Sequence, residues 1–287
     1  MAKEKIAIVT DSSSSLDYLN YDEYDNIFMV RMPIYFGNKE YIDGKTITVE
    51  EFYQRIETED IIPSTSQPSL GETLDLYEKL KDEGYTDIIH FPISKGLSGV
   101  YQSLFSIRDI VDGINVHIVD TRSTAIILGF IVLEAARLVK DNKSVSEVLT
   151  YSEYLSTHYK PYFMVDDLKY LIKNGRLSNA AGFIGSVLKI KPILTFNDIG
   201  EIIGIEKIRT TKKAMNHIIQ KILEETKSYK KVQYFISYGH NQTLIEEFKA
   251  QVAQYIDLED VIESILPSVI GAHVGSGIVA LGYFVLE

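Results

Sequence analysis

The sequence predicts an α/β protein with an N-terminal three-layer α/β/α domain, built on a parallel sheet, and a C-terminal two-layer α+β domain with a mixed sheet. Two observations carry this prediction. Up to about residue 155, short β-branched runs alternate with segments of helical periodicity. Beyond that point strand-like runs follow one another more directly, and a turn with Asn197 and Gly200 joins two of them. We therefore expect a first domain over 1–155 and a second over 156–287.

In the first half, the β-branched run 5–9 predicts a strand, and the serines at 12–15 predict the turn that follows it. Helices are predicted wherever apolar residues recur every three or four positions. The further strands are expected at 26–36, running into a hairpin, at 86–93 and at 116–120, and the helices at 47–57, 70–84, 98–111 and 123–142.

The second half mixes strands and helices less regularly. Gly175 is expected to end a short helix, and the stretch 271–286 reads as a glycine turn that leads into an apolar run. The strands are expected at 162–165, at 231–239 and as a hairpin over 191–209, and the helices at 145–158, 168–175, 179–189, 211–227 and 243–256.

Composition excludes several classes of function. The 287 residues carry a formal net charge of -11, which argues against non-specific binding to nucleic acid and against docking on an anionic membrane. The chain has no cysteine, so a disulfide, a thiolate nucleophile or a cysteine metal site is impossible. The first residues do not form a secretory signal, and no apolar stretch is long enough for stable membrane insertion. We expect a soluble cytoplasmic protein.

The turn SKGLSGVYQS at 94–103 joins a predicted strand to a predicted helix but carries no acid, histidine or cysteine. Val100 stands where a nucleophile elbow needs its second glycine, and the chain has no P-loop or dinucleotide fingerprint. A helix that starts near Ser98 would aim free N–H groups into the turn, and Gly96 and Gly99 would let a ligand approach the backbone. The turn could therefore bind a carboxylate or phosphate, or Ser98 could simply cap the helix.

A second hydroxyl-rich turn, PSTSQPSLGE, starts at residue 63. Thr65 and Ser66 precede Pro68, a position that suits the first turn of a helix. The turns at 11–15 and 120–124 follow further predicted strands, and the carboxyl ends of parallel strands meet at one edge of the sheet. We expect the four turns to converge there, with Asp11 in a structural role.

His273 differs from the other histidines because glycines surround it in GAHVGSG, which reads as a loop. A histidine in such a loop can reach a ligand, although it can equally be an ordinary loop residue. No histidine, aspartate or glutamate pattern has the spacing of a metal site, so we expect neither a metal nor a cofactor.

Several of these stretches together resemble the DegV family, whose members include the fatty-acid-binding subunit of bacterial fatty acid kinase. The matching segments span nearly the whole chain in the family's order: IVTDSSSSL (8–16), STSQPS (64–69), ISKGLSGVYQS (93–103), IVDTRSTAIILGF (118–130), LKYLIKNGRLSNAAGFIGSVLKIKPIL (168–194) and IGAHVGSGIVALGY (270–283).

The resemblance implies a two-domain protein that buries one long-chain fatty acid and does no catalysis of its own. A separate ATP-dependent kinase subunit would phosphorylate the carboxylate, and Arg176 and Arg209 could contact that partner. Ser276 departs from the proline that many relatives have in the glycine loop, which can change the geometry at the head group. The resemblance places the carboxylate at Thr65, Ser66, Ser98, Gly99 and His273.

The acyl chain is expected in an apolar channel of the second domain, with candidate wall residues Phe163, Ile184, Leu188, Ile190, Ile193, Leu194 and Ile278. Two helix N-termini, the hydroxyls and an imidazole would hold the carboxylate without a buried lysine or arginine. Two other functions stay open: a hydrolase that uses Ser98 and His273, and a lipid-sensing regulatory protein. The expected oligomeric state is a monomer or a weak dimer.

Overall fold

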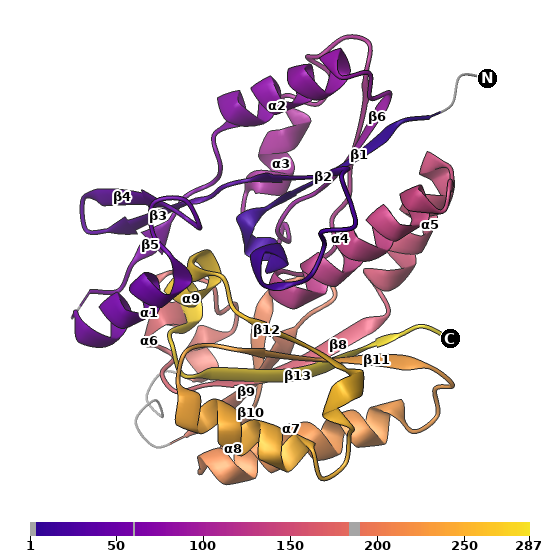
Figure 1. Cartoon of the computed structure of the whole chain (residues 1–287). Coiled ribbons are helices and arrows are strands. Elements are labelled where there is room, and N and C mark those ends of the chain that lie inside the picture. The colour runs from indigo at the N-terminus through magenta and orange to yellow at the C-terminus, as the bar shows by residue number, and fades with distance from the viewer. Residues whose placement is uncertain (1–3, 60, 184–189) are drawn as a thin grey trace.

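The computed structural model describes residues 4–59, 61–183 and 190–287 (Figure 1). The fold is of the predicted α/β class, with a parallel sheet in the N-terminal part and a mixed sheet in the C-terminal part. The boundary predicted near residue 155 falls between a helix that ends at Leu155 and a strand that begins at Tyr159.

The first sheet is parallel throughout its described strands. Its central strand is buried along its whole length, as expected where helices cover both faces of a parallel sheet. Helices α2 (Leu70–Asp82) and α3 (Val100–Phe105) lie on one side, while α4 (Ala125–Lys140) and α5 (Val145–Leu155) lie on the side of the second sheet (Figure 1). In spatial order the strands are β2 (Ile27–Val30), β1 (Ile6–Asp11), β6 (Asp87–Phe91) and β7 (Asn115–Ile118).

A small antiparallel sheet stands apart from the first sheet. The predicted strand over 26–36 is divided, because β2 pairs with β1 whereas β3 (Pro33–Phe36) pairs with β4 (Lys39–Ile42) and with the two-residue strand β5 (Ser64–Thr65). Helix α1 (Val49–Thr58) follows β4 and starts with a capping box. This arrangement carries Thr65 away from the edge of the parallel sheet.

The second sheet is mixed and has helices α7 (Thr211–Thr226) and α8 (Gln242–Val252) on one face (Figure 1). Strands β11 and β12 are parallel and the other described pairs are antiparallel. In spatial order the strands are β10 (Ile202–Ile208), β9 (Lys191–Phe196), β8 (Tyr159–Val165), β13 (Ile278–Val285), β11 (Val232–Tyr238) and β12 (Val261–Ile265).

The other face of the second sheet packs toward the N-terminal part. Helix α4 contacts both β1 and β11, so it lies between the two sheets. One hydrophobic core runs through both parts of the chain, and a second core fills the space between the mixed sheet and the helices α7 and α8. Residues along β13 alternate between these cores, since successive side chains of a strand point to opposite faces.

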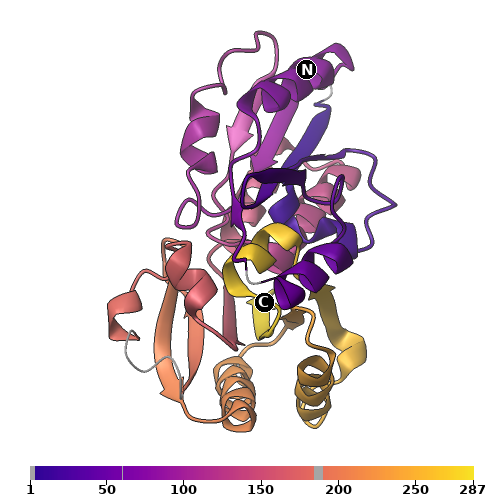
Figure 2. The same cartoon turned by 90° about the vertical axis from the view of Figure 1, so that its left-hand side faces the viewer.

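The remaining helical elements are short. Helix α9 (Ser268–Val274) packs against α1, β3 and β5, as Figure 2 shows for α9 in yellow beside α1. Helix α6 (Lys169–Lys173) ends as predicted before Gly175, whose φ is 66°. The 3₁₀ turns are η1 (Ser12–Ser14), η2 (Leu16–Tyr18), η3 (Ala180–Gly182) and η4 (Leu258–Asp260).

Four features of the structure differ from the prediction. Helix α3 spans only 100–105 and not 98–111. Strand β12 was not predicted, because its short run is interrupted by Glu263 and Ser264. The segment read as a glycine loop at 271–277 is helical as far as Val274. The helix predicted over 179–189 is a 3₁₀ turn at 180–182, and most of its remainder lies outside the described residues. Within the part that is described, no helix combines the length and apolarity needed to cross a bilayer.

Candidate functional site

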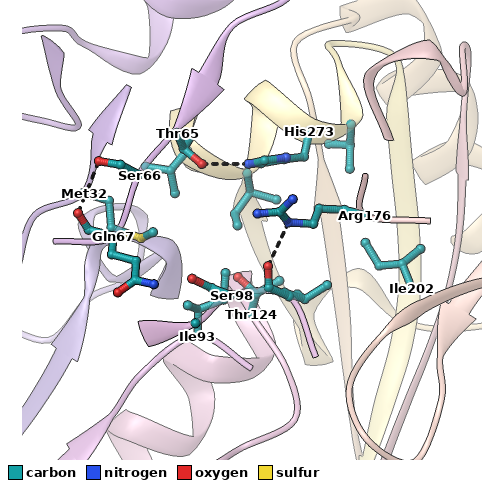
Figure 3. Close-up of a pocket in the computed structure, with 15 residues that line it drawn as sticks. Met32, Thr65, Ser66, Gln67, Ile93, Ser98, Thr124, Arg176, Ile202 and His273 are labelled. Carbon is teal, nitrogen blue, oxygen red and sulfur yellow. Dashed lines mark hydrogen bonds between the residues drawn. The ribbon is translucent and has the colours of Figure 1, made fainter. Parts of the chain in front are cut away.

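A cavity of about 310 Å³ lies where loops of the N-terminal part meet helix α9 and residues of the C-terminal part (Figure 3). Polar side chains lie on two sides of it, with Thr65 and His273 on one side and Ser98 on the other, and apolar side chains form the rest of the wall (Figure 3). The lining residues are Met32, Thr65, Ser66, Gln67, Ile93, Leu97, Ser98, Gly99, Thr124, Arg176, Ile202, Val269, Ile270, His273 and Val274.

Thr65 reaches the cavity from a strand and not from a helix N-terminus. It pairs with Ile34 of β3. Helix α2 begins five residues later at Leu70, and its N-cap is Ser69, whose Oγ accepts a hydrogen bond from the Glu72 N–H at 3.2 Å. The expectation of a helix N-terminus at Thr65 and Ser66 is therefore wrong, because Ser69 takes the capping position.

His273 lies in the last turn of α9, so the predicted loop is wrong at this position. Close packing requires a glycine at position 271 of this helix, because a Cβ there would lie 2.8 Å from the Tyr53 hydroxyl and 2.8 Å from the ring of Phe52. The helix ends at Gly275, which has a φ of +78°. Asn174 Nδ2 donates to the carbonyl oxygens of Pro63 at 3.3 Å and Ala272 at 3.0 Å. These contacts fix α9 beside the strand that carries Thr65.

Thr65 and His273 form the polar centre of the cavity. The Thr65 hydroxyl and His273 Nε2 are 2.8 Å apart although 208 positions separate them in the chain. Burial, with a further contribution from the charge of Arg176, lowers the pKa of His273 to about 4. The ring is therefore neutral at pH 7, and its buried Nδ1 has no hydrogen-bond partner among the described residues. With the proton on Nε2, the ring donates to Thr65 and leaves the threonine hydroxyl free to donate to a ligand.

The turn at 94–99 forms the side of the cavity opposite Thr65 and His273. Ser98 is not the N-cap of α3, since Gly99 takes that position. Within the described residues the Ser98 hydroxyl accepts only a long hydrogen bond, 3.4 Å, from the Val100 N–H, so its proton remains for a ligand. Gly99 has a packing role: a Cβ there would lie 2.6 Å from Gln67 Nε2. Gln67, which the sequence did not single out, lines the cavity and accepts from the Ser103 hydroxyl at 2.8 Å.

Arg176 brings a positive charge into the cavity, where only neutral donors were expected. Its Nε donates to the Leu97 carbonyl at 2.9 Å, and Figure 3 shows the guanidinium between His273 and Ser98. The residue was predicted to contact a partner protein, and the structure places it in the cavity wall. Arg209 is exposed between β10 and α7 and is not among the lining residues.

A second, apolar cavity of about 60 Å³ adjoins the first and shares four lining residues with it, Thr124, Ile202, Ile270 and Val274. The predicted channel residues Phe163 and Ile278 line this cavity. The sequence missed Phe196, Phe235 and Leu266, which line it as well. Phe235 lies two residues before Ser237 on β11, so both point to the cavity face, but the sequence carries no signal that tells this face from the other.

The other predicted channel residues have different positions. Ile193 and Leu194 are neighbours on β9, so they point to opposite faces of the sheet. Leu194 belongs to the core on the cavity side, whereas Ile193 packs in the core against α7 and α8 and is wrong as a wall residue. Ile190 packs at the margin of the first core. Ile184 and Leu188 lie outside the described residues.

Of the four turns predicted to converge at the edge of the parallel sheet, those after β1, β6 and β7 do so, whereas the turn at 63–72 includes β5 of the small antiparallel sheet. Asp11 has the structural role expected of it: one carboxylate oxygen accepts from Ser13 and the other accepts from the Ile93 N–H at 2.8 Å. Burial raises the pKa of Asp11. Thr124, in the turn after β7, lines both cavities and donates to the Ser13 carbonyl at 3.3 Å. Among the described residues no cluster of histidine, aspartate and glutamate could hold a metal ion.

Replacing Arg176 with glutamine should raise the pKa of His273 from about 4, because one of the two causes that lower it is removed. The pKa should remain below 6.5, since burial persists. NMR titration of the His273 ring measures the change. Arg209→Gln is the matched control, as Arg209 lies outside the cavity. An unchanged His273 pKa in Arg176→Gln would show that the guanidinium does not act on the ring.

Comparisons with known proteins agree with this architecture. The family model described as "Uncharacterised protein, DegV family" matches residues 5–286. A DegV domain-containing protein of Staphylococcus aureus strain COL is 38% identical over 97% of each chain. The crystal structure of a fatty acid binding DegV family protein from Streptococcus agalactiae superposes with a TM-score of 0.91 at 29% identity, covering 99% of this chain and 100% of that one. DegV from Bacillus subtilis, a fatty acid binding protein, gives a TM-score of 0.85 at 31% identity over 98% and 99% of the two chains.

The fold and the cavity thus define an α/β protein with a parallel and a mixed sheet and a cavity where its two parts meet. The chain belongs to the DegV family.

Proposed function

We propose that this protein binds a long-chain fatty acid, with the carboxylate at Thr65, Ser98, Arg176 and His273 and the acyl chain running from the larger cavity into the apolar one. The observation that carries the proposal is the Thr65–His273 pair, at 2.8 Å, beside a cavity that adjoins an entirely apolar one. The fatty acid binding proteins from S. agalactiae and B. subtilis have the same fold and support it.

The two ends of the ligand would contribute differently. An acyl chain gains about 0.8 kcal/mol per buried methylene, so about 15 methylenes would supply roughly 12 kcal/mol before ordering costs. A carboxylate taken out of water must be hydrogen-bonded, and hydroxyls, a neutral imidazole and one guanidinium can provide this. The tail would then set the affinity, and the polar residues would set the position of the carboxylate.

We further propose that the protein is not itself the catalyst and presents the carboxylate to a separate ATP-dependent kinase subunit. The geometry disfavours a Ser98–His273 hydrolase. A catalytic serine must hydrogen-bond to the histidine, and an acid must orient the other ring nitrogen. Here His273 Nε2 pairs with Thr65, and Nδ1 has no partner in the part of the chain that the structure describes.

Mass spectrometry of the purified protein after denaturation tests fatty acid binding directly. We expect a long-chain fatty acid to be released, at up to one molecule per chain. Protein that carries none, and takes up none when palmitate and oleate are added, would rule the proposal out.

The presentation step has its own test. In the presence of the kinase and ATP, Ser98→Ala and His273→Ala should each reduce acyl phosphate formation more than they reduce retention of the fatty acid, because the tail contacts remain. Equal losses of both would contradict a positioning role. Labelling of Ser98 by a fluorophosphonate probe would favour the hydrolase instead.

A further inference from the structure

The face of the mixed sheet that lines the apolar cavity has its smallest residues in the middle. Along β13, alternate residues face this side, namely Ile278, Ala280, Gly282 and Phe284. Ile278, Ala280 and Phe284 belong to the core on this side, while Val279, Leu281 and Tyr283 belong to the core on the other face. The strand thus offers a shallow groove between a branched side chain and an aromatic ring.

The neighbouring strands β8 and β11 place a residue beside each of these positions of β13. At the level of Ala280, β8 contributes Phe163 and β11 contributes Ser237, and all three line the apolar cavity. At the level of Gly282 the partners are Pro161 and Phe235, which also line it. Gly282 itself is not among the lining residues.

Phe235 covers Gly282. A Cβ at Gly282 would lie 2.2 Å from Cζ and 2.7 Å from Cε2 of the Phe235 ring. The ring therefore occupies the space that a side chain on β13 would take, and it can lie across the strand only because the residue there is glycine. Phe235 is almost fully buried.

Beyond this level, aromatic rings fill the face of the sheet. Phe284 has its ring centroid 4.4 Å from that of Phe130 on α4 and 5.6 Å from that of Phe235. The ring centroid of Tyr159 lies 5.9 Å from that of Phe284. Of these residues only Phe235 lines the cavity, so its ring is the surface at which the cavity ends on this side.

We propose that Phe235, seated on Gly282, forms the floor of the acyl channel and sets the longest fatty acid that the protein accepts. This inference rests on the proposed function. A chain that is too long must push its terminal methyl against a ring that is backed by Gly282 and Phe284, and close-packed interiors accommodate extra methylenes poorly. One extra methylene in a filled pocket changes selectivity by about 10–200-fold.

Two substitutions that change the depth of the channel in opposite directions test this. Phe235→Leu and Phe235→Ala should extend the retained acids toward longer chains, with the larger shift for alanine. Ala280→Leu adds volume one level before the floor and should shift the profile toward shorter chains. Each variant and the wild type are incubated with an equimolar mixture of saturated acids from laurate to behenate. The retained acids are then quantified by mass spectrometry.

Leu281→Ala is the matched control, since Leu281 is fully buried on the same strand but faces the other core. It should lower thermal stability without moving the chain-length profile. If Phe235→Ala does not fold, Phe235→Leu and Ala280→Leu still decide the question.

The outcomes separate the two proposals. A wild type that retains none of the acids overturns the proposed function and this inference with it. If the wild type retains acids and Phe235→Leu and Ala280→Leu retain the same chain lengths as the wild type, Phe235 is not the floor of the channel. The proposal of fatty acid binding then still stands.

Discussion

Replacing His273 with alanine is expected to remove most of the preference of the protein for a fatty acid over the fatty alcohol of the same length. The wild type should favour palmitate over palmityl alcohol by about tenfold or more, because hydrogen bonds to a charged group are worth roughly 1.5–3 kcal/mol each. Without His273, the Thr65 hydroxyl loses the partner that orients it at 2.8 Å. Binding of the alcohol should change little, since the apolar contacts are the same.

Displacement of a fluorescent fatty acid by palmitate and by palmityl alcohol measures the two affinities. His240→Ala is the matched control, because His240 lies outside both cavities and its ring bonds Glu57 instead. If His273→Ala kept the wild-type ratio of the two affinities, the polar centre would not lie at Thr65 and His273.

Replacing Gly129 with alanine is expected to lower the free energy of unfolding by about 1–3 kcal/mol, the range for overpacking a filled core. In an exposed helix the same change would instead stabilise by up to about 1 kcal/mol. Here a Cβ would lie 2.2 Å from the Ser14 carbonyl oxygen and 2.9 Å from Leu19 Cδ1. Helix α4 must then move away from the turn that contains Ser14.

Urea denaturation followed by circular dichroism measures the loss. Gly182→Ala is the control, because no atom of the described residues lies within 4 Å of a Cβ built there, and it should change stability by less than about 0.5 kcal/mol. Two variants of equal stability would mean that α4 can shift away from Ser14 at little cost. Because Thr124 binds the Ser13 carbonyl and lines both cavities, we also expect Gly129→Ala to weaken ligand binding.

The sequence by itself determined the elements whose signals are local. The parallel sheet, the long helices α4 and α7 and the β9–β10 hairpin follow from hydrophobic periodicity and turn residues, which act over a few positions. The structural role of Asp11 could also be predicted, since an aspartate after a strand commonly binds the backbone two residues on. The family could be identified from motifs spread over the chain.

Only the tertiary structure decided how these pieces form a site. Thr65 lies on a strand because β3 pairs with it, and His273 lies on a helix because α9 packs closely on Tyr53 and Phe52 at Gly271. Arg176 enters the cavity because the Leu97 carbonyl, far away in sequence, holds its Nε. The face to which Ile193 points depends on strand register, which a shift of one residue would reverse. Each of these outcomes depends on contacts between segments distant in sequence, and local propensity carries no information about them.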